Sequence, residues 1–581
     1  MSKDILGEEL KKMRHTAAHV LAAASVELKP ETRLGVGPAT DDGFFHDIGV
    51  DENYTEVDLK MLEKKMRGIQ KRDLPMKHYT VSKAEAREMF KADPFKLELI
   101  DEIEDEKVGI SEMGDGFFKT LCEGGHAEST GKIGAFKLMR MSGVYWKNDE
   151  SKPQLQRIYG VLFPTEEELD KHLEMLEEAK KRDHKILGKK LDLFTFSPLV
   201  GQGLPLFTPK GTVVLEELKK FVEELHTEAG YTRVIIPHLA KPELYKTSGH
   251  WDKFKDDLFH VHGRGKEEFV VKPMNCPHHT QIFASQPRSY RDMPVRYAES
   301  TAVYRDEQSG ELQGLTRVRS ITQDDGHAFC RPDQVKDEIE RIMTMIEKFY
   351  KALSLDLSFR LSLRDPSQPE KYLGTDEIWE NAEEALRSVL QAKNIEFEEV
   401  TGEAAFYGPK IDFTAHDSLG RAWQLATVQL DFNMPARFKL SYVDENGQQQ
   451  TPVMIHRAVM GSFDRFFGVL IEHYAGDFPL WLSPVQVAVL PISDDQKAYA
   501  EEVAAQLLAA GLRVEVDGRS ESIGKKIREA EQMKMPVMLI IGKREAEAGT
   551  VAVRSRDKGD EGAKAVEEVA KELADKVKQR A

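Results

Sequence analysis

The sequence predicts a multidomain protein of the α+β and α/β classes. Its 581 residues are too many for a single hydrophobic core and favour three or four domains. Short β-like runs such as "LSFRLSL" and "AWQLATVQLDF", interleaved with amphipathic helices, predict a mainly antiparallel sheet flanked by helices over residues 192–482. Over residues 483–581, strands alternate with helices, which is typical of a small α/β domain with a parallel core.

Residues 1–164 are expected to form a separate α+β domain. Residues 15–25 have the apolar spacing of a helix, and the glycine-rich stretch 34–50 then alternates as a strand pair would. Residues 57–73 again have helical period with mixed charge. Helices and strands therefore follow one another in this part of the chain without the regular alternation of a parallel α/β fold.

A polar segment at residues 165–191 has helical period, and we interpret it as a linker helix between two domains. Thr165 and Glu168 have the spacing of a capping box and mark its first turn.

Composition narrows the class of protein. A hydrophobic content of 40% with 31% charged residues fits a folded, soluble, cytoplasmic protein, and three cysteines exclude a disulfide framework. No secretory signal is apparent, and no apolar run reaches the ~18 residues of a membrane span. The net charge of −17 speaks against non-specific coating of nucleic acid but not against local basic patches that grip RNA.

The stretch "KPMNCPHHTQIF" raises the question of a metal site. Structural zinc sites commonly use two short chelating pairs, and Cys276 followed by His278 and His279 does not supply them. Two alternatives remain from the spacing. Either one cysteine is buried beside two surface histidines, or one of the three residues joins ligands from distant parts of the chain.

Several motifs of residues 192–482 give the sequence a specific resemblance. "GYTRVIIPHL", "YRDEQSGELQGLTRVRSITQDDGHAF" and "PVMIHRAVMGSFDRFFGVLIEHY" resemble motifs 1, 2 and 3 of class II aminoacyl-tRNA synthetases. Together with "MNCP", "AFYGPKID" and "ATVQLDF", they are similar to the threonyl-tRNA synthetase family over nearly the whole chain. The resemblance implies ATP-dependent formation of threonyl-adenylate, transfer of threonine to the 3′ end of tRNA(Thr), and hydrolytic editing of seryl-tRNA.

The resemblance implies one zinc ion per chain, held by Cys276, His327 and His456. The two histidines lie 51 and 180 residues beyond the cysteine. His278 and His279 are then expected not to be ligands. Three protein ligands leave a coordination position open, as in catalytic zinc sites. A site built for a hydroxyl group also rejects valine strongly.

The resemblance also assigns the residues that bind ATP and its magnesium ion. Arg305 is expected at the α-phosphate, Arg465 at the γ-phosphate and adenine, and Glu307 at the adenine amino group, with Arg317 and Ser462 in the same substrate site. Guanidinium groups suit this chemistry because they stay protonated and bind phosphate oxygens in pairs. Ile321 stands where the family often has an aromatic residue, which predicts weaker contact with adenine.

For L-threonine, the resemblance implies a pocket with Asp325 as the partner of the ammonium group. The other matching positions are Gln323, Tyr407, Lys410 and Gln429. His250 matches a family histidine near the terminal ribose of tRNA and is expected to assist acyl transfer.

Residues 1–164 resemble the family's editing domain. His15, His19, Cys122 and His126 have the spacing of a zinc site, but the resemblance favours metal-free hydrolysis, with a metal-bound site as the alternative. Thr120 stands where the family commonly has an aspartate, which predicts slower editing. Because His15 comes so early, we expect the family's small ubiquitin-like domain to be missing.

Residues 483–581 resemble the family's anticodon-binding domain, with Glu545 and Arg554 at the matching positions. Motif 1 implies a homodimer, with Pro237 ending a strand at the subunit interface.

Two other classes of protein remain open: an RNA-binding paralogue without catalysis, and a free-standing hydrolase of mischarged tRNA. Threonine-dependent exchange of pyrophosphate with ATP distinguishes all three.

Overall fold

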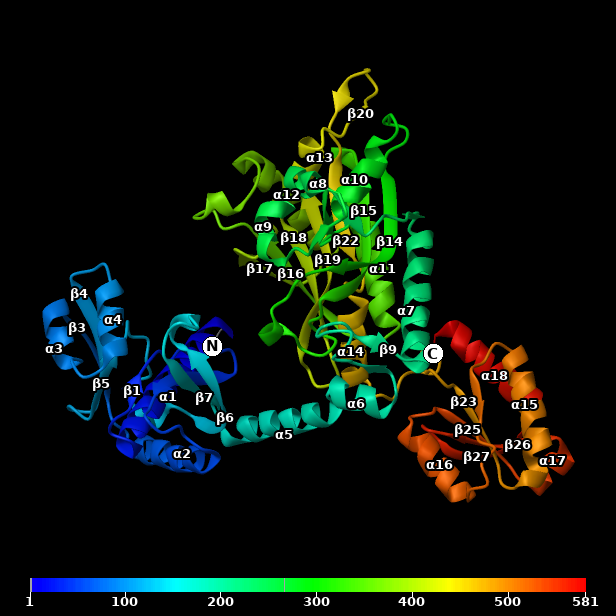
Figure 1. The fold of residues 1–581 in the computed structure, drawn as a ribbon, viewed down its shortest axis with the longest axis horizontal. Helices are drawn as coiled ribbons and strands as arrows, with labels where there is room; N and C mark the ends of the chain where they lie inside the picture. The colour runs from blue at the N-terminus through cyan, green and yellow to red at the C-terminus, as the bar shows by residue number, and fades with distance from the viewer. Residues whose placement is uncertain (1–2, 266, 581) are drawn as a thin grey trace. The chain divides into compact units, whose positions relative to one another are not determined.

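A computed structural model describes residues 3–265 and 267–580. The chain folds into two compact units, Met1–Glu178 and Ala179–Ala581, each described here by itself. In Figure 1 the chain is coloured from blue at the N-terminus to red at the C-terminus, so that the first unit is blue to cyan.

The first unit has two sheets. One has the order β1 (Arg33–Leu34), β2 (Gly43–Gly49), β7 (Gln154–Phe163) and β6 (Ala135–Tyr145), and the other the order β3 (Met76–Ser82), β4 (Lys107–Met113) and β5 (Phe118–Leu121). The helices are α1 (Lys3–Leu28), α2 (Glu56–Lys71), α3 (Lys83–Met89) and α4 (Pro94–Glu102). The apolar residues of α1 and α2 form one core with β2, β6 and β7, so the predicted α+β class is confirmed.

The predicted linker helix is interrupted. The structure has α5 (Glu166–Arg182) and then α6 (His184–Lys190). Thr165 and Glu168 form the predicted capping box, with both backbone N–H groups 3.2 Å from the side-chain oxygens. Asp183 breaks the helix because its backbone is not helical (φ −49°, ψ 119°) and its carboxylate accepts the N–H of Lys185 to cap α6.

The second unit is built on what we call the large sheet. Its strands have the order β10 (Thr232–Arg233), β14 (Val295–Tyr304), β15 (Ser320–Cys330), β22 (Val453–Ala458), β19 (Ala422–Asp431), β18 (Lys410–His416), β16 (Asp356–Leu363) and β17 (Phe397–Thr401). The β10–β14 and β16–β17 pairs are parallel and the other pairs are antiparallel. This confirms the predicted antiparallel class.

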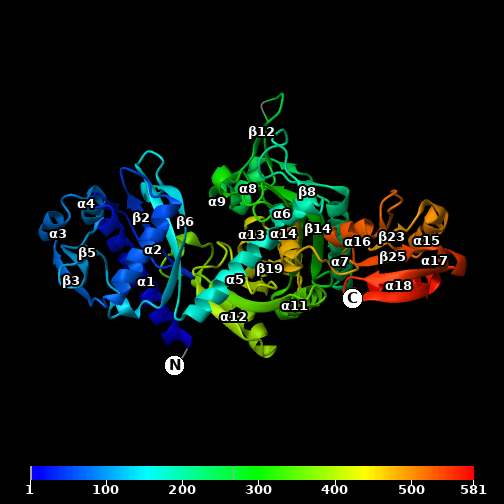
Figure 2. The same cartoon turned by 90° about the horizontal axis from the view of Figure 1, so that it is seen from below.

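The two faces of the large sheet have different roles. Helices α7 (Pro209–Glu228), α11 (Val335–Lys351), α12 (Asp376–Ala392) and α14 (Phe463–His473) share one large hydrophobic core with the alternate strand residues Ala328, Val428, Leu430 and Ile455. In Figure 2, α11 and α12 lie below the sheet, and α8 (Pro242–Ser248) and α9 (His250–Lys253) lie above it. The upper face also carries α10 (Cys276–Ala284) and α13 (Asn433–Arg437).

Strand register places polar residues in one row on this second face. His327 pairs with His456, His456 with Gln429, and Gln429 with Lys410. Directly opposed residues of antiparallel strands project from the same face, as do residues two apart on one strand. Asp325 therefore joins the same face.

Motif 1 departs from the predicted strand. β10 ends at Arg233, short of Pro237. The N–H of Val234 still donates to the Ala298 carbonyl at 3.1 Å, but the N–H of Ile236 donates to the Glu299 side chain, 3.2 Å away, and not to a backbone carbonyl. Small sheets complete this region: β8 (Phe194–Thr195) with β9 (Leu206–Phe207), β11 (Leu239–Ala240) with β13 (Glu268–Val271) and β12 (His260–His262), and β20 (Tyr442–Val443) with β21 (Gln449–Gln450).

The C-terminal part confirms the predicted α/β domain. Its sheet has the order β24 (Val514–Val516), β23 (Val487–Pro491), β25 (Val537–Ile541), β26 (Thr550–Ser555) and β27 (Gly559–Ala565), and the first three strands are parallel. The helices are α15 (Lys497–Ala509), α16 (Ile523–Gln532), α17 (Lys543–Ala548) and α18 (Val566–Gln579). Arg513 joins this domain to α7 through an ion pair of 2.8 Å with Glu217.

Over residues 3–265 and 267–580, every helix is too short or too polar to traverse a bilayer.

Candidate functional site

Cys276, His327 and His456 lie together on the polar face of the large sheet. All three are buried, and one potential ligand atom from each lies within 4.8 Å of the others. Cys276 begins α10, while His327 and His456 are register partners on β15 and β22. The structure thus brings together residues that are distant in sequence, in the combination that the sequence predicts.

Two neighbours fix the orientation of the histidines. Nε2 of His456 lies 3.0 Å from Oδ2 of Asp431, and Nδ1 of His327 lies 2.7 Å from Nδ1 of His279. Each ring therefore has a second nitrogen that could serve a metal ion, Nδ1 of His456 and Nε2 of His327, and the latter also lies 3.7 Å from Oδ1 of Asp325. A thiolate and two imidazoles with supported outer nitrogens form a donor set that suits zinc. Burial raises the pKa of the Cys276 thiol well above its usual value, so a cation is needed to stabilise the thiolate there.

The histidines after Cys276 are both buried, against the alternative that they lie at the surface. His279 contacts a predicted ligand, which the sequence did not indicate. Neither ring nitrogen of His278 has a hydrogen-bond partner among the described residues. His250 is also buried, with Nε2 3.6 Å from Sγ of Cys276 and Nδ1 2.8 Å from Oγ of Ser248, and burial lowers its pKa to about 3.

The residues that are predicted to bind the substrate threonine line the same face. Asp325 accepts a hydrogen bond of 2.9 Å from Asn275, and burial raises the pKa of its carboxyl group. The hydroxyl of Tyr407 donates to Gln429. Lys410 forms an ion pair of 2.8 Å with Asp412, a residue that sequence reasoning missed.

The two predicted phosphate-binding arginines are half-buried with buried Nε atoms, and burial lowers the pKa of both. Neither Nε atom has a partner within the part of the chain that the structure describes. Arg305 lies 5.1 Å from the ring centre of Phe254, and Arg465 lies 5.9 Å from that of Trp423. Buried guanidinium donors without partners are costly, so these two groups are suited to an anionic ligand.

The loop after β14 and the start of α14 add the remaining predicted substrate residues. The Glu307 carboxylate forms an ion pair of 2.6 Å with Arg317. Ser462 caps α14 by accepting the N–H of Arg465, 3.1 Å away, and its backbone forms a bridge with Gln323. Motif 2 and motif 3 are therefore joined directly.

The four predicted editing residues also meet. Sγ of Cys122 lies 3.5 Å from Nε2 of His15 and 3.2 Å from Nε2 of His126, and the His19 and His126 ring centres are 4.4 Å apart. Burial lowers the pKa of His15 and of His19, so both rings favour the neutral form that accepts a proton. Burial acts to raise the pKa of Cys122, but hydrogen bonds from His126 and from the Gly124 backbone outweigh it.

The editing cluster has neighbours that the sequence did not indicate. Lys96 on α4 is buried, donates to the carbonyl of Gly35 at 3.0 Å, and has a pKa lowered by burial to about 8. Ser111 lies 3.0 Å from Nε2 of His126 and is the register partner of Thr120. The hydroxyl of Thr120 is buried and has no partner among the described residues.

In the C-terminal domain, the two predicted RNA-reading residues have partners within the protein. Glu545 caps α17 by accepting the N–H of Gly542, 2.9 Å away, and Arg554 on β26 pairs with Glu531 at 3.2 Å. Base recognition through these side chains requires that the pairs open or share their acceptors.

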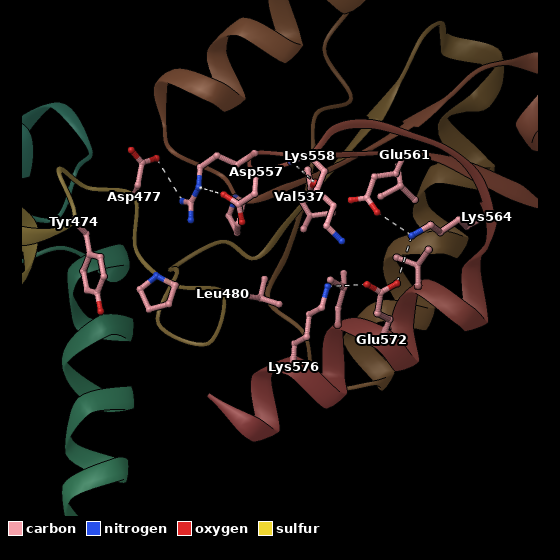
Figure 3. Close-up of a pocket in the computed structure, with 17 residues that line it drawn as sticks. Tyr474, Asp477, Leu480, Val537, Asp557, Lys558, Glu561, Lys564, Glu572 and Lys576 are labelled. Atoms are coloured by element: carbon pink, nitrogen blue, oxygen red, sulfur yellow. Dashed lines mark hydrogen bonds and ion pairs between the residues drawn. The ribbon is translucent and has the colours of Figure 1, made fainter. Parts of the chain in front are cut away.

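A cavity of about 430 Å³ in the second unit lies between the end of α14 and the C-terminal domain (Figure 3). Its charged rim is internally paired: Lys576 with Glu572 at 2.7 Å and Lys564 with Glu561 at 3.1 Å. None of the predicted site residues lines it.

Three protein families match parts of the chain. The tRNA synthetase class II core domain (G, H, P, S and T) matches residues 259–474, and an anticodon binding domain matches residues 486–576. The threonyl and alanyl tRNA synthetase second additional domain matches residues 108–159.

Whole-chain relatives agree with these matches. The threonine–tRNA ligase of Rubrobacter xylanophilus is 51% identical over 95% of this chain and 86% of its own length, and that of Thermus thermophilus is 48% identical over 94% and 86%. The RNA binding domain of threonyl-tRNA synthetase from Cryptosporidium parvum superposes with a TM-score of 0.65 at 37% identity, over 68% of this chain and 98% of that chain. The chain therefore belongs to the threonine–tRNA ligase family of class II aminoacyl-tRNA synthetases.

Proposed function

We propose that the chain activates L-threonine with ATP to threonyl-adenylate and transfers threonine to the 3′ end of tRNA(Thr). The observation that carries this proposal is the cluster of Cys276, His327 and His456 on the same sheet face as Asp325. Threonine–tRNA ligase relatives of about half-identical sequence support it independently.

Cys276, His327 and His456 would hold one zinc ion. When bound, zinc supplies open coordination for the amino and hydroxyl groups of threonine. Asp325 carries the negative charge opposite the ammonium group, and Asn275 holds its carboxylate in place. Valine is rejected because it leaves the hydroxyl position unpaired, whereas serine lacks only a methyl group and is admitted more readily.

Arg305 and Arg465 stabilise the negative charge that develops on the phosphates as threonine attacks ATP. Their buried, unpartnered Nε groups are fixed before the substrate arrives. Glu307, Arg317 and Ser462 shape the site around the nucleotide, and magnesium accompanies ATP. His250, next to Cys276, assists transfer at the tRNA ribose.

His15, His19, Cys122 and His126 hydrolyse seryl-tRNA by positioning water at the ester, without a metal ion. A pair of histidines with lowered pKa values is suited to accept a proton from that water. Selection against serine in the activation site is limited to the ~1–3 kcal/mol that a methyl group provides, so a second hydrolytic site serves accuracy.

The protein is proposed to work as a cytoplasmic homodimer that binds tRNA(Thr) partly through Glu545 and Arg554. Ile235, next to β10, is 82% exposed, and Leu199, between β8 and β9, is 99% exposed. Large apolar side chains exposed in this way favour burial against a second copy of the chain.

Threonine-dependent exchange of pyrophosphate with ATP by the full chain tests the proposal. We expect exchange with threonine, weak exchange with serine and little with valine. A folded chain that binds tRNA but does not exchange would be an RNA-binding paralogue, and one that only deacylates seryl-tRNA would be a hydrolase.

A further inference from the structure

His184 lies where three segments of the second unit meet. Its backbone begins α6, the remainder of the predicted linker. Nδ1 lies 2.6 Å from Oε1 of Glu472 on α14, and Nε2 lies 3.0 Å from the backbone N–H of Leu315 in the loop between β14 and β15. His184 and Glu472 are both buried, so water does not substitute for these bonds.

The two bonds define the protonation of the ring. An amide N–H can only donate, so Nε2 of His184 carries no proton and accepts from Leu315. Nδ1 then carries the proton and donates to Glu472. Asp183, His184 and Glu472 lie close enough to hold a metal ion, but both ring nitrogens are already used. The group is therefore a joint between protein segments.

A glycine lets the loop close on the imidazole ring, and a second glycine lies beside the ring on α14. A Cβ atom on Gly314, in the same loop as Leu315, would lie 2.3 Å from Nε2 of His184. A Cβ atom on Gly468 of α14 would lie 3.5 Å from Cδ2 of the same ring. Gly314 also has a φ of +52°, which favours glycine. The loop thus contacts the ring at Nε2 and Cε1, and the helix contacts it at the neighbouring atoms Cδ2 and Cγ.

The loop and the helix are the two elements that carry the predicted ATP-binding groups. The loop from residue 305 to 319 carries Arg305, Glu307 and Arg317, and α14 carries Arg465. We propose that His184 is a positioning residue that joins the two ATP-binding elements, and this inference rests on the proposed function. Its bonds hold the loop tip at Leu315 against α14 before ATP binds.

Removing both bonds leaves one buried polar group without its partner, the Leu315 N–H, because the Glu472 carboxylate keeps the His184 backbone N–H at 3.1 Å and Arg421 at 2.7 Å. Ordering the loop then costs free energy when ATP binds. The zinc cluster and the threonine pocket lie elsewhere on the sheet. We expect the KM for ATP to rise about ten-fold, the equivalent of one buried hydrogen bond. The KM for threonine and the zinc content should stay near those of the unaltered chain.

His184→Phe keeps a ring of similar size and removes both bonds, and His184→Gln restores one donor and one acceptor. His416→Phe is the matched control, because His416 lies on β18 with its ring 3.0 Å from the hydroxyl of Ser358, away from the loop. Each full-length variant is assayed for pyrophosphate exchange with ATP and threonine titrated separately. Hydrogen–deuterium exchange of residues 305–319 is measured without ligands.

The inference is supported if His184→Phe raises the KM for ATP selectively and increases amide exchange in the loop, and if His184→Gln recovers part of both. It is overturned if a folded His184→Phe chain matches the control in both readouts, or if the two KM values rise together. Should His184→Phe fail to fold, Glu472→Gln must show a smaller, ATP-selective effect, and its absence overturns the inference. If the unaltered chain shows no threonine-dependent exchange, the proposed function fails, and the amide exchange of the loop still tests the joint.

Discussion

Nδ1 of His279 lies 2.7 Å from Nδ1 of His327, and the two rings are nearly perpendicular at 86°. Both rings are buried, so one donates to the other with no competing water. The contact occupies Nδ1 of His327 and leaves Nε2 as the nitrogen for a metal ion. A residue that is not itself a predicted ligand therefore orients one that is.

Replacement of His279 should weaken zinc binding without removing a ligand. We expect His279→Phe to lose zinc to a chelator about 10–100-fold more readily, the usual effect of losing an outer hydrogen bond at a metal site. Zinc release measured with a coloured chelator checks this. His278→Phe is the control, and equal release by the two variants would contradict the orienting role.

The purified full chain should contain about one zinc ion per molecule, held by three protein ligands. Cys276→Ser should lose most of it, because a neutral hydroxyl replaces the thiolate. Elemental analysis after dialysis measures the content, with His278→Gly as a control that should keep its zinc. Unchanged zinc in Cys276→Ser would remove the cluster as the metal site.

Arg305→Ala and Arg465→Ala should each reduce threonine-dependent pyrophosphate exchange by at least about 100-fold, since each removes a fixed positive charge worth several kcal/mol in the transition state. Thermal unfolding shows whether the chain remains folded. Arg360→Ala is the control, because Arg360 pairs with Glu398 on the far edge of the large sheet. A folded Arg305→Ala chain with normal exchange would mean that motif 2 is misinterpreted.

His15→Ala combined with His19→Ala should let seryl-tRNA accumulate while threonyl-adenylate forms normally, because the two clusters belong to different units. Thr120→Asp should accelerate deacylation if the missing carboxylate limits it, since the buried Thr120 hydroxyl has no partner among the described residues. Hydrolysis of preformed seryl-tRNA by the full chain measures both. If the unaltered chain hydrolyses no faster than buffer, the N-terminal domain does not edit.

The buried Lys96 predicts a pH-dependent stability. Burial lowers its pKa from 10.5 to about 8, so between those pH values the unfolded chain holds a proton that the folded chain has released. Stability therefore rises with pH through this window, and the penalty is fully present below pH 8. Lys96→Met should stabilise the first unit by about 3 kcal/mol at pH 7 and by little near pH 10.5. Amide exchange of α4, compared between the two chains at each pH, tests this; a gain that does not change with pH would contradict it.

Motif resemblance predicts Cys276, His327 and His456 as one set, and the structure places them together, although zinc binding itself stays a prediction. His279 could not be assigned from its sequence neighbours. Its contact depends on how α10 packs on β15, which is a tertiary relationship. The burial of Lys96 could not be predicted from the sequence either, because a lysine in "FKLELI" is typical of a solvated helix face.

Some differences from the sequence predictions had readable signals. Asp183 in "KRDHKI" is a good helix N-cap, and it divides the predicted linker helix. The short β10 had no such signal, since "TRVII" has strong β propensity, whereas in the structure the Ile236 N–H donates to the side chain of the distant Glu299. Secondary structure was therefore predictable where local chemistry decides it, and not where a distant side chain does.

The single row that joins His327, His456 and Gln429 across three strands limits how this gene can vary in length. Side chains alternate along a strand, so the loss or gain of one codon within β15, β19 or β22 would turn a site residue to the opposite face. The loops between those strands carry no such restriction. Insertions and deletions that survive in related genes should therefore be found between these strands and hardly ever inside them.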